Sequence, residues 1–416
     1  EQEVVRACRN WQDEFRDRLL ESMGEARATD VLAHLGDGFP PGYSDRFTPA
    51  TGVVDLQTLL ELTPESPLAM SFYQPLAQQQ GILHCKLYHL SDSLPLSDVI
   101  PVLENLGLRV LGEFPFRITQ ADGTAFWIHD FEFTFVGGAT LDIQEANELF
   151  RDAFKAVWSG QAENDGFNRL VLLAGLPWRD VALLRAYARY LKQIRLGFEL
   201  PYIASTLVAH ADIARELVRL FRTRFYLARK LSAEDLGEMQ QKLERAVLGA
   251  LDEVAVLNED RILRRYLDLI KATLRTNFYQ PDANGQSKDY LSLKFDPSAI
   301  PELPLPRPMF EIFVYSPRVE GVHLRGGKVA RGGLRWSDRE EDYRTEVLGL
   351  VKAQQVKNAV IVPVGAKGGF VPRRLPSGGT RDEVQQEAIA CYRLFIQGLL
   401  DITDNLADGK VVPPPN

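Results

Sequence analysis

The spacing of apolar residues changes along this 416-residue chain, and these changes restrict the folds that it can adopt. The first segment shows helical spacing on both sides of a loop rich in glycine and proline. Strand-like runs follow from residue 66, and helical spacing returns from about 141 to 278. The remainder alternates short apolar runs with helical segments, which is typical of α/β folds. We therefore predict an α+β, multidomain chain with four segments, 1–64, 65–140, 141–278 and 279–416.

The second segment has a recognisable order of elements. With the preceding helix it reads helix, strand, strand, helix, strand, strand, and the turn Ala121–Thr124 has the composition of a hairpin turn. The internal helix is expected to open with a cap at Ser97 and to close at Gly107. This order is a circular shift of the split βαβ, ferredoxin-like order. Modules of this kind serve in ligand sensing or assembly, and the order alone favours a purely structural role at least as strongly.

Composition excludes several classes of protein. Hydrophobic and charged fractions of 45% and 25% are those of a globular protein. No apolar run reaches the 18 residues of a membrane span, and the charged N-terminal sequence lacks the apolar core of a signal peptide. Three widely spaced cysteines argue against a disulfide framework and fit a reducing cytoplasm. No Cys/His cluster has the spacing of metal ligands, so we expect no metal, and the net charge of −8 argues against a general nucleic-acid binder.

Positive charge is concentrated in one segment of this acidic chain. Between Gly321 and Arg374 there are eleven basic and five acidic side chains, a net charge of +6. The stretch GVHLRGGKVARGGLRWSDR adds glycine pairs, which let a backbone approach a ligand closely, and arginine forks, which suit carboxylates and phosphates. We predict a loop over 321–335 that binds a small anion. A glycine-rich turn with exposed arginines explains the stretch equally well, and an RGG-type nucleic-acid segment explains it less well.

Two lysines follow this stretch. A helix is predicted over 342–357, and Lys357 stands at its end, where it either caps the helix dipole or binds a ligand. A strand is predicted over 358–364, and Lys367 follows at its carboxyl end, where α/β sheets commonly hold their sites. The neighbouring glycines would leave room for a substrate beside Lys367, namely Gly365, Gly368 and Gly369. Lys367 is therefore either a catalytic base or a turn lysine that points to water.

Dinucleotide-binding and P-loop motifs are absent from the sequence. No G-x-G-x-x-G sequence follows a predicted strand, so the sequence predicts no dinucleotide-binding domain within these residues. The final stretch, DGKVVPPPN, adds no closing element to the predicted α/β segment. We therefore expect the chain to be an internal piece of a longer polypeptide.

The combination of RGGLR at 331–335 with KNAVIVPVGAKGG at 357–369 resembles the substrate-domain signature of glutamate dehydrogenases. The resemblance is greatest to the large bacterial NAD-specific enzymes and extends to 127–133 and 162–194. It implies an ACT-like module over 65–140, a helical spacer over 141–278, and the first part of an α/β substrate-binding domain over 279–416, without its Rossmann half.

The resemblance also implies roles for individual residues. Lys367 is similar to the catalytic lysine, which activates the water that attacks the iminium formed after hydride transfer. Lys357 is similar to the lysine that binds the substrate α-carboxylate, and Arg331 stands where smaller enzymes have a carboxylate-binding lysine. The expected substrate-binding residues are thus Arg331, Lys357, Gly332, Gly333 and Gly365, with Arg335, Glu346 and Lys352 in support. Arginine in place of lysine at 331 is a departure from the smaller enzymes, as is one glycine fewer before Lys367.

The implied activity of the parent protein is the oxidative deamination of L-glutamate to 2-oxoglutarate and ammonia by a cytoplasmic homo-oligomer. NAD would be bound by residues beyond 416, together with the catalytic aspartate, so these residues alone are expected to be inactive. An amino-acid effector is a further expected partner, whereas nucleic acid and membrane are not. In the alternative interpretation, the chain is a non-catalytic amino-acid-sensing or oligomerisation module.

Overall fold

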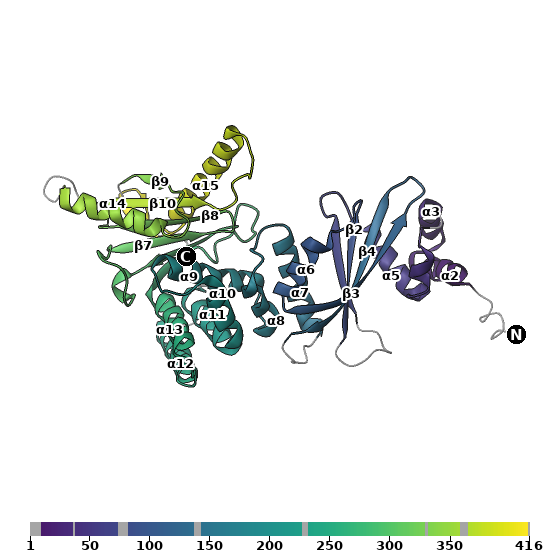
Figure 1. The fold of residues 1–416 in the computed structure, drawn as a ribbon, viewed down its shortest axis with the longest axis horizontal. Helices are drawn as coiled ribbons and strands as arrows, with labels where there is room; N and C mark the ends of the chain where they lie inside the picture. Colours follow the sequence, from purple (N-terminus) through teal and green to yellow (C-terminus); the bar gives the residue numbers. More distant parts are fainter. Residues whose placement is uncertain are drawn as a thin grey trace. The chain divides into compact units, whose positions relative to one another are not determined.

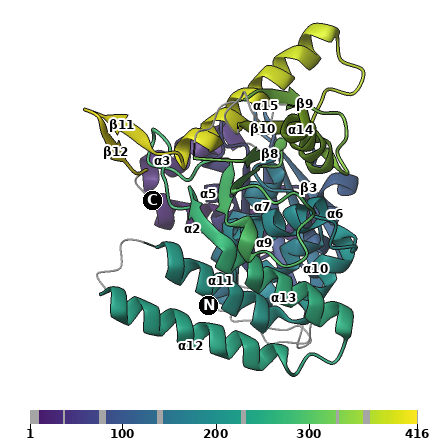
Figure 2. The same ribbon diagram turned by 90° about the vertical axis from the view of Figure 1, so that its left-hand side faces the viewer.

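The computed structural model describes residues 10–35, 38–73, 82–136, 143–226, 232–328, 332–357 and 365–414. These residues form helices and several β-sheets in two compact units, residues 1–151 and 152–416 (Figures 1 and 2). The predicted α+β, multidomain character is therefore confirmed. The finer division at 64, 140 and 278 stays a prediction.

The first unit is built around one four-stranded sheet. Helices α2 (Trp11–Met23), α3 (Glu25–Leu35), α4 (Pro41–Ser44) and α5 (Pro49–Leu60) precede strands β1 (Leu68–Tyr73) and β2 (Leu83–Leu90). Helix α6 (Leu96–Asn105) and strands β3 (Leu108–Thr119) and β4 (Ala125–Phe135) follow, and helix α7 (Ile143–Trp158) begins in the first unit and ends in the second. Apolar side chains of the first helices share one core with the sheet residues Tyr88, Phe116, Ile118, Phe126 and Ile128.

The strand order of this sheet is β1-β2-β4-β3, and every neighbouring pair is antiparallel. The order helix, strand, strand, helix, strand, strand predicted from the sequence is therefore confirmed. Gly107 closes helix α6 with φ of 93°, as expected, but Ser97 lies inside the helix, which has Pro95 at its N-cap. Helix α5 begins inside the predicted loop because the Thr48 side chain caps it and Pro49 suits its first turn.

The second unit begins with helices. These are η1 (Gly166–Arg169), α8 (Leu170–Leu173), α9 (Trp178–Gln193), α10 (Leu200–Ala209), α11 (Ala211–Phe225), α12 (Ala233–Leu251) and α13 (Leu257–Ala272). The predicted helical segment is thus confirmed over most of its length. Its last part is wrong, because helix α13 ends at Ala272 and strand β5 (Thr273–Thr276) follows directly.

A six-stranded sheet completes the second unit. It contains β5, β6 (Leu291–Phe295), β7 (Phe310–Tyr315), β8 (Val319–Arg325), β9 (Leu334–Trp336) and β10 (Ala366–Pro372), in the order β5-β6-β7-β8-β10-β9. All pairs are antiparallel except β9 with β10. The other elements are η2 (Pro297–Ala299), α14 (Tyr343–Lys357), α15 (Arg381–Asp401) and the hairpin β11 (Asn405–Ala407) with β12 (Lys410–Val412).

Helices α14 and α15 cover opposite faces of this sheet (Figure 1). A Cβ atom on Gly369 of β10 would meet Val347 of α14, and one on Gly321 of β8 would meet Phe395 of α15. Cross-strand partners share a face and neighbours in a strand alternate, so the register assigns each side chain to one helix. Because both faces are covered, strand β8 is buried throughout, and the prediction of a loop over 321–335 is wrong for its first part.

Candidate active site

Lys367 is the second residue of strand β10, not a loop residue after a strand. The expected position after the end of a strand is therefore wrong, as is the alternative of a turn lysine, and the predicted strand 358–364 lies outside the described residues. Lys367 is half-buried and lies opposite Leu324 of β8. Since Gly369, two residues on, faces Val347, Lys367 is on the face covered by α14. Pairing with β8 restrains its backbone, and pairing with β9 begins at the next residue, Gly368.

The two motifs that contain Lys367 and Arg331 meet through their backbones. An ideal Cβ atom on Gly332 would lie 1.6 Å from the carbonyl oxygen of Ala366. The Gly368 N–H donates to the carbonyl oxygen of Gly333 at 3.3 Å, and the Gly326 N–H donates to that of Gly365 at 3.1 Å. Only glycine allows the approach at position 332. The structure thus brings RGG and AKGG together, although Arg331 itself lies outside the described residues.

The glycines after Lys367 have a different use from the one predicted. A Cβ atom on Gly368 would lie 2.4 Å from the Leu334 side chain, and one on Gly369 would lie 2.6 Å from Val347. Both glycines are buried. Neither leaves room for a substrate, because protein side chains fill the space beside them. They allow strand β9 and helix α14 to pack closely on β10.

Arg335 and Glu346 form an ion pair beside this strand. Their N···O distance is 3.0 Å, and the Ser337 hydroxyl donates to the same carboxylate at 2.6 Å. Arg335 is paired with Gly369 in the sheet and remains more than half exposed, whereas the Glu346 side chain is only 14% exposed. Glu346 therefore orients an arginine that can still reach solvent, on the face of the sheet that carries Lys367.

The remaining predicted residues lie on or near helix α14. Lys357 is the last described residue of this helix, and its side chain lies outside the described part. Lys352 is exposed on the same helix. The structure thus places Lys367, Arg335 and Glu346 on one face of the sheet, whereas the side chains of Arg331 and Lys357 are not among those it describes.

Glu311 and Arg344 are the residues that sequence reasoning missed. Glu311 of β7 accepts two hydrogen bonds from Arg344 of α14, at 2.6 and 2.7 Å, and neither side chain is exposed. Glu311 is paired with Leu324, which is paired with Lys367, so the three side chains form a row on the α14 face. A glutamate inside the apolar run FEIFVYS was the available signal, because a buried carboxylate needs a partner.

Helix α9 is joined to this arrangement through Gln193. The Gln193 side chain accepts from the Arg344 N–H at 3.2 Å and donates to the carbonyl oxygens of Glu340 and Glu341 at 3.0 and 3.3 Å. It therefore fixes the turn that precedes α14. The helical part of this unit and its sheet are connected at the helix that ends in Lys357.

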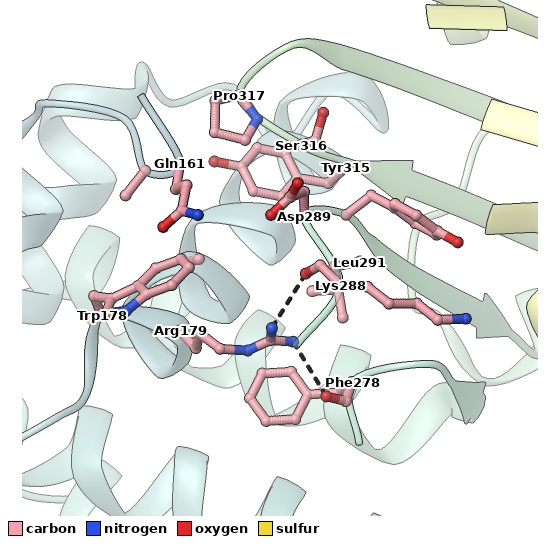
Figure 3. Close-up of a pocket in the computed structure, with 13 residues that line it drawn as sticks. Gln161, Trp178, Arg179, Phe278, Lys288, Asp289, Leu291, Tyr315, Ser316 and Pro317 are labelled. Atoms are coloured by element: carbon pink, nitrogen blue, oxygen red, sulfur yellow. Dashed lines mark hydrogen bonds between the residues drawn. The ribbon is translucent and has the colours of Figure 1, made fainter. Parts of the chain in front are cut away.

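A small pocket lies elsewhere in the second unit (Figure 3). Its cavity volume of about 30 Å³ suits roughly one water molecule. Arg179 crosses it and donates to the carbonyl oxygens of Lys288 and Phe278, at 3.1 and 3.2 Å, while burial lowers its pKa. None of the predicted site residues lines this pocket. Arg179 holds two chain segments together there.

The described residues do not fit the binding of a dinucleotide. Such sites lie between parallel strands at the N-terminus of a crossover helix. In the described part of the chain, only the pair β9 and β10 is parallel, and Gly332 and Gly333 lead into strand β9 rather than into a helix. No cluster of possible metal ligands occurs among the described residues. Among the helices they form, none has the length and apolar character needed to span a membrane.

Four family models match consecutive segments of the chain. They are described as glutamate dehydrogenase helical motif 2 (residues 18–62), glutamate dehydrogenase ACT3 domain (67–146), glutamate dehydrogenase helical motif 3 (162–227), and bacterial NAD-glutamate dehydrogenase catalytic domain (246–416). The last of these contains the whole Lys367 region.

Curated relatives agree with these matches. The chain is 74% identical to an NAD-specific glutamate dehydrogenase of Pseudomonas aeruginosa over its full length, and 53% identical to one of Halomonas elongata. A protein of the same name from Mycobacterium tuberculosis is 44% identical over 99% of the chain. The chain spans about a quarter of the length of these relatives, 26%, 25% and 26% respectively. It therefore belongs to the family of bacterial NAD-specific glutamate dehydrogenases.

Proposed function

We propose that the chain provides part of the substrate site of an NAD-dependent glutamate dehydrogenase, which converts L-glutamate to 2-oxoglutarate and ammonia in the cytoplasm. The observation that carries the proposal is the contact between the RGG and AKGG motifs. Gly332 lies against the Ala366 carbonyl group, so two motifs far apart in sequence form one backbone unit next to Lys367. The names of the relatives support the same reaction.

Lys367 acts in this proposal as the catalytic base that activates water. A catalytic base needs a fixed position. Pairing of Lys367 with β8, and of the following residues with β9, fixes the backbone at this position. Lys357 and Arg331 bind substrate carboxylates, and Gly332, Gly333 and Gly365 allow close approach of the backbone. Arg335, held by Glu346, supplies a further cation on the same face, and Lys352 adds positive charge at its rim. A cationic site of this kind suits a substrate with two carboxylates.

The described residues do not fit the binding of NAD, so none of them is assigned to it. We propose that it is bound by residues beyond 416, and that the sheet of the first unit is an ACT-like module that responds to an amino-acid effector. The strand order β1-β2-β4-β3 and the description of the family model over 67–146 support the second proposal. We also propose that the complete enzyme is a homo-oligomer.

The test uses a longer polypeptide, which contains this chain and is as long as the curated relatives. Lys367→Ala should lower turnover by about 10²–10⁴-fold, the usual contribution of a general base, without loss of fold. Circular dichroism checks the fold, and NADH absorbance measures turnover. Lys242→Ala, at an exposed lysine of α12, is the matched control and should change nothing. Turnover within tenfold of the unsubstituted enzyme in Lys367→Ala would show that this lysine is not the base.

A further inference from the structure

Positive charge also gathers on the opposite face of the six-stranded sheet, the one covered by α15. Arg275 of β5 is paired with Lys294 of β6, and Lys294 is paired with Ile312, which belongs to the core formed with Phe395 of α15. Arg325 of β8 shares this face, because Gly321, four residues earlier in the strand, lies against Phe395. Three cations from three strands therefore lie on one face, at the end of the sheet where strand β8 ends.

In the described part of the chain, fewer carboxylates than cations lie at this end of the sheet. Arg275 forms an ion pair with Asp404 at 2.7 Å. Arg325 is buried and donates to neutral groups, the Nδ1 atom of His323 and the hydroxyl of Thr403, each at 3.2 Å. Burial, followed by the charge of Arg325, lowers the pKa of His323 to about 4, so this histidine is uncharged near neutrality. One carboxylate thus faces three cations.

Lys294 is the cation with the least compensation. It is half-buried, and its Nζ atom lies 4.5 Å from the centre of the Phe310 ring. Burial and the charges of Arg275 and Arg325 lower its pKa, which only Asp404 opposes. A half-buried ammonium group between two guanidinium groups, with one carboxylate at the edge, is the electrostatic arrangement of an anion site.

We infer that Arg275, Lys294 and Arg325 form a second anion-binding site, on the face of the sheet opposite Lys367, for a carboxylate or phosphate group. Asp404 occupies part of it, so an incoming anion competes with this carboxylate for Arg275. Arg275 also donates to the Ile402 carbonyl oxygen at 3.3 Å, and Arg325 donates to the Thr403 hydroxyl. Binding of an anion to these two arginines therefore changes the contacts of the turn that follows α15. This inference concerns binding alone and does not depend on the proposed dehydrogenase activity.

Isothermal titration calorimetry on the 416-residue chain tests the site, with inorganic phosphate and glutarate as separate probes. Lys294→Ala should weaken binding of at least one probe by tenfold or more, and Lys294→Gln, which keeps the chain length and removes the charge, should do the same. Asp404→Asn removes the competing carboxylate and should tighten binding several-fold. The probe that responds identifies the chemistry as phosphate or carboxylate.

Two controls separate this site from other cations. Lys242→Ala should leave binding unchanged, since this lysine is exposed on α12. Lys367→Ala should leave the binding of phosphate unchanged, because Lys367 is on the other face; glutarate is not used for this control, since the proposed substrate site also suits a dicarboxylate. No binding of either probe, unchanged binding in both Lys294 variants, or loss of phosphate binding in Lys367→Ala would overturn the inference. The proposed function is tested separately, by measuring the turnover of the longer polypeptide that is as long as the relatives.

Discussion

Glu311 and Arg344 form a two-point ion pair, with distances of 2.6 and 2.7 Å, in which neither side chain is exposed to solvent. The pair joins strand β7 to the beginning of helix α14, which carries Glu346 and ends at Lys357. Burying two charges costs desolvation free energy, which is offset only when the pair has good hydrogen-bond geometry. The pair thus determines where α14 lies on the sheet, on the face of Lys367.

Arg344→Met should destabilise the second unit strongly. Glu311 would remain buried without a partner, and breaking a buried pair in this way costs about 3–5 kcal/mol. Urea unfolding followed by circular dichroism measures the loss. The double variant Glu311→Leu with Arg344→Met removes both charges and should recover most of the stability. Equal losses in the single and double variants would contradict this account.

Gly332 and Gly333 offer a matched pair of substitutions. A Cβ atom on Gly332 would overlap the Ala366 carbonyl oxygen, whereas one on Gly333 would meet nothing within 4 Å. Gly332→Ala should therefore cost about 1–3 kcal/mol, as overpacking does, and Gly333→Ala less than about 0.5 kcal/mol. Thermal unfolding of both variants compares them. In the longer polypeptide, which is as long as the relatives, Gly332→Ala should also reduce turnover more than Gly333→Ala. A reversed order would show that the close approach is unimportant.

His323 should make stability depend on pH in the acid range. Burial and Arg325 lower its pKa in the folded chain to about 4, below its ordinary value of 6.5. The unfolded chain therefore binds more protons between these values, and stability present above pH 6.5 is lost as the pH falls toward 4. The loss is about 1.4 kcal/mol per pH unit, or about 3 kcal/mol in total.

His323→Gln keeps an acceptor for Arg325 and removes this titration. Unfolding free energies of both proteins at pH 7, 6 and 5 isolate the contribution, since the carboxylates titrate in each. The stability advantage of the unsubstituted chain over His323→Gln should shrink with falling pH. A constant difference across this range would exclude His323 as the titrating group.

Asp55 should hold the first helices of the first unit to its sheet. Its carboxylate accepts from Lys86 at 2.5 Å, from Tyr43 at 2.5 Å and from Tyr88 at 2.8 Å. Asp55→Ala leaves the Lys86 ammonium group buried without its partner, so it should cost about 3–5 kcal/mol. Hydrogen exchange should then increase in α5 and in strands β1 and β2 together. Glu61→Ala, at an exposed residue after α5, is the control. Faster exchange in α5 alone would show that helix and sheet are independent.

Local signals predicted the elements of the fold well. The order strand, strand, helix, strand, strand predicted for the second segment appears in the structure, and the helix predicted over 342–357 is present as α14. Helix ends were less predictable. Thr48 and Pro49 begin a helix inside a glycine- and proline-rich stretch, and residues 273–276 continue a helical pattern as a strand. In the second case, pairing with β6 outweighs the local periodicity.

The candidate site was predictable as a set of motifs but not as a geometry. RGG and AKGG are visible in the sequence, and the resemblance that they carry identified the family. The sequence did not show that Gly368 and Gly369 receive Leu334 and Val347, because both neighbours come from other elements. Nor did it show that Arg275 and Lys294 share a face of the sheet with Arg325, since the three residues lie on separate strands.

The sequence by itself determined the order of helices and strands, the concentration of positive charge between Gly321 and Arg374, and the family. These properties depend on the spacing and identity of residues near one another in the chain. Only the tertiary structure decided that Lys367 lies in a strand, that Glu311 is compensated by Arg344, and that Gly332 abuts Ala366. Each of these depends on which faces of the sheet the helices cover, and burial of that kind is a property of the whole fold.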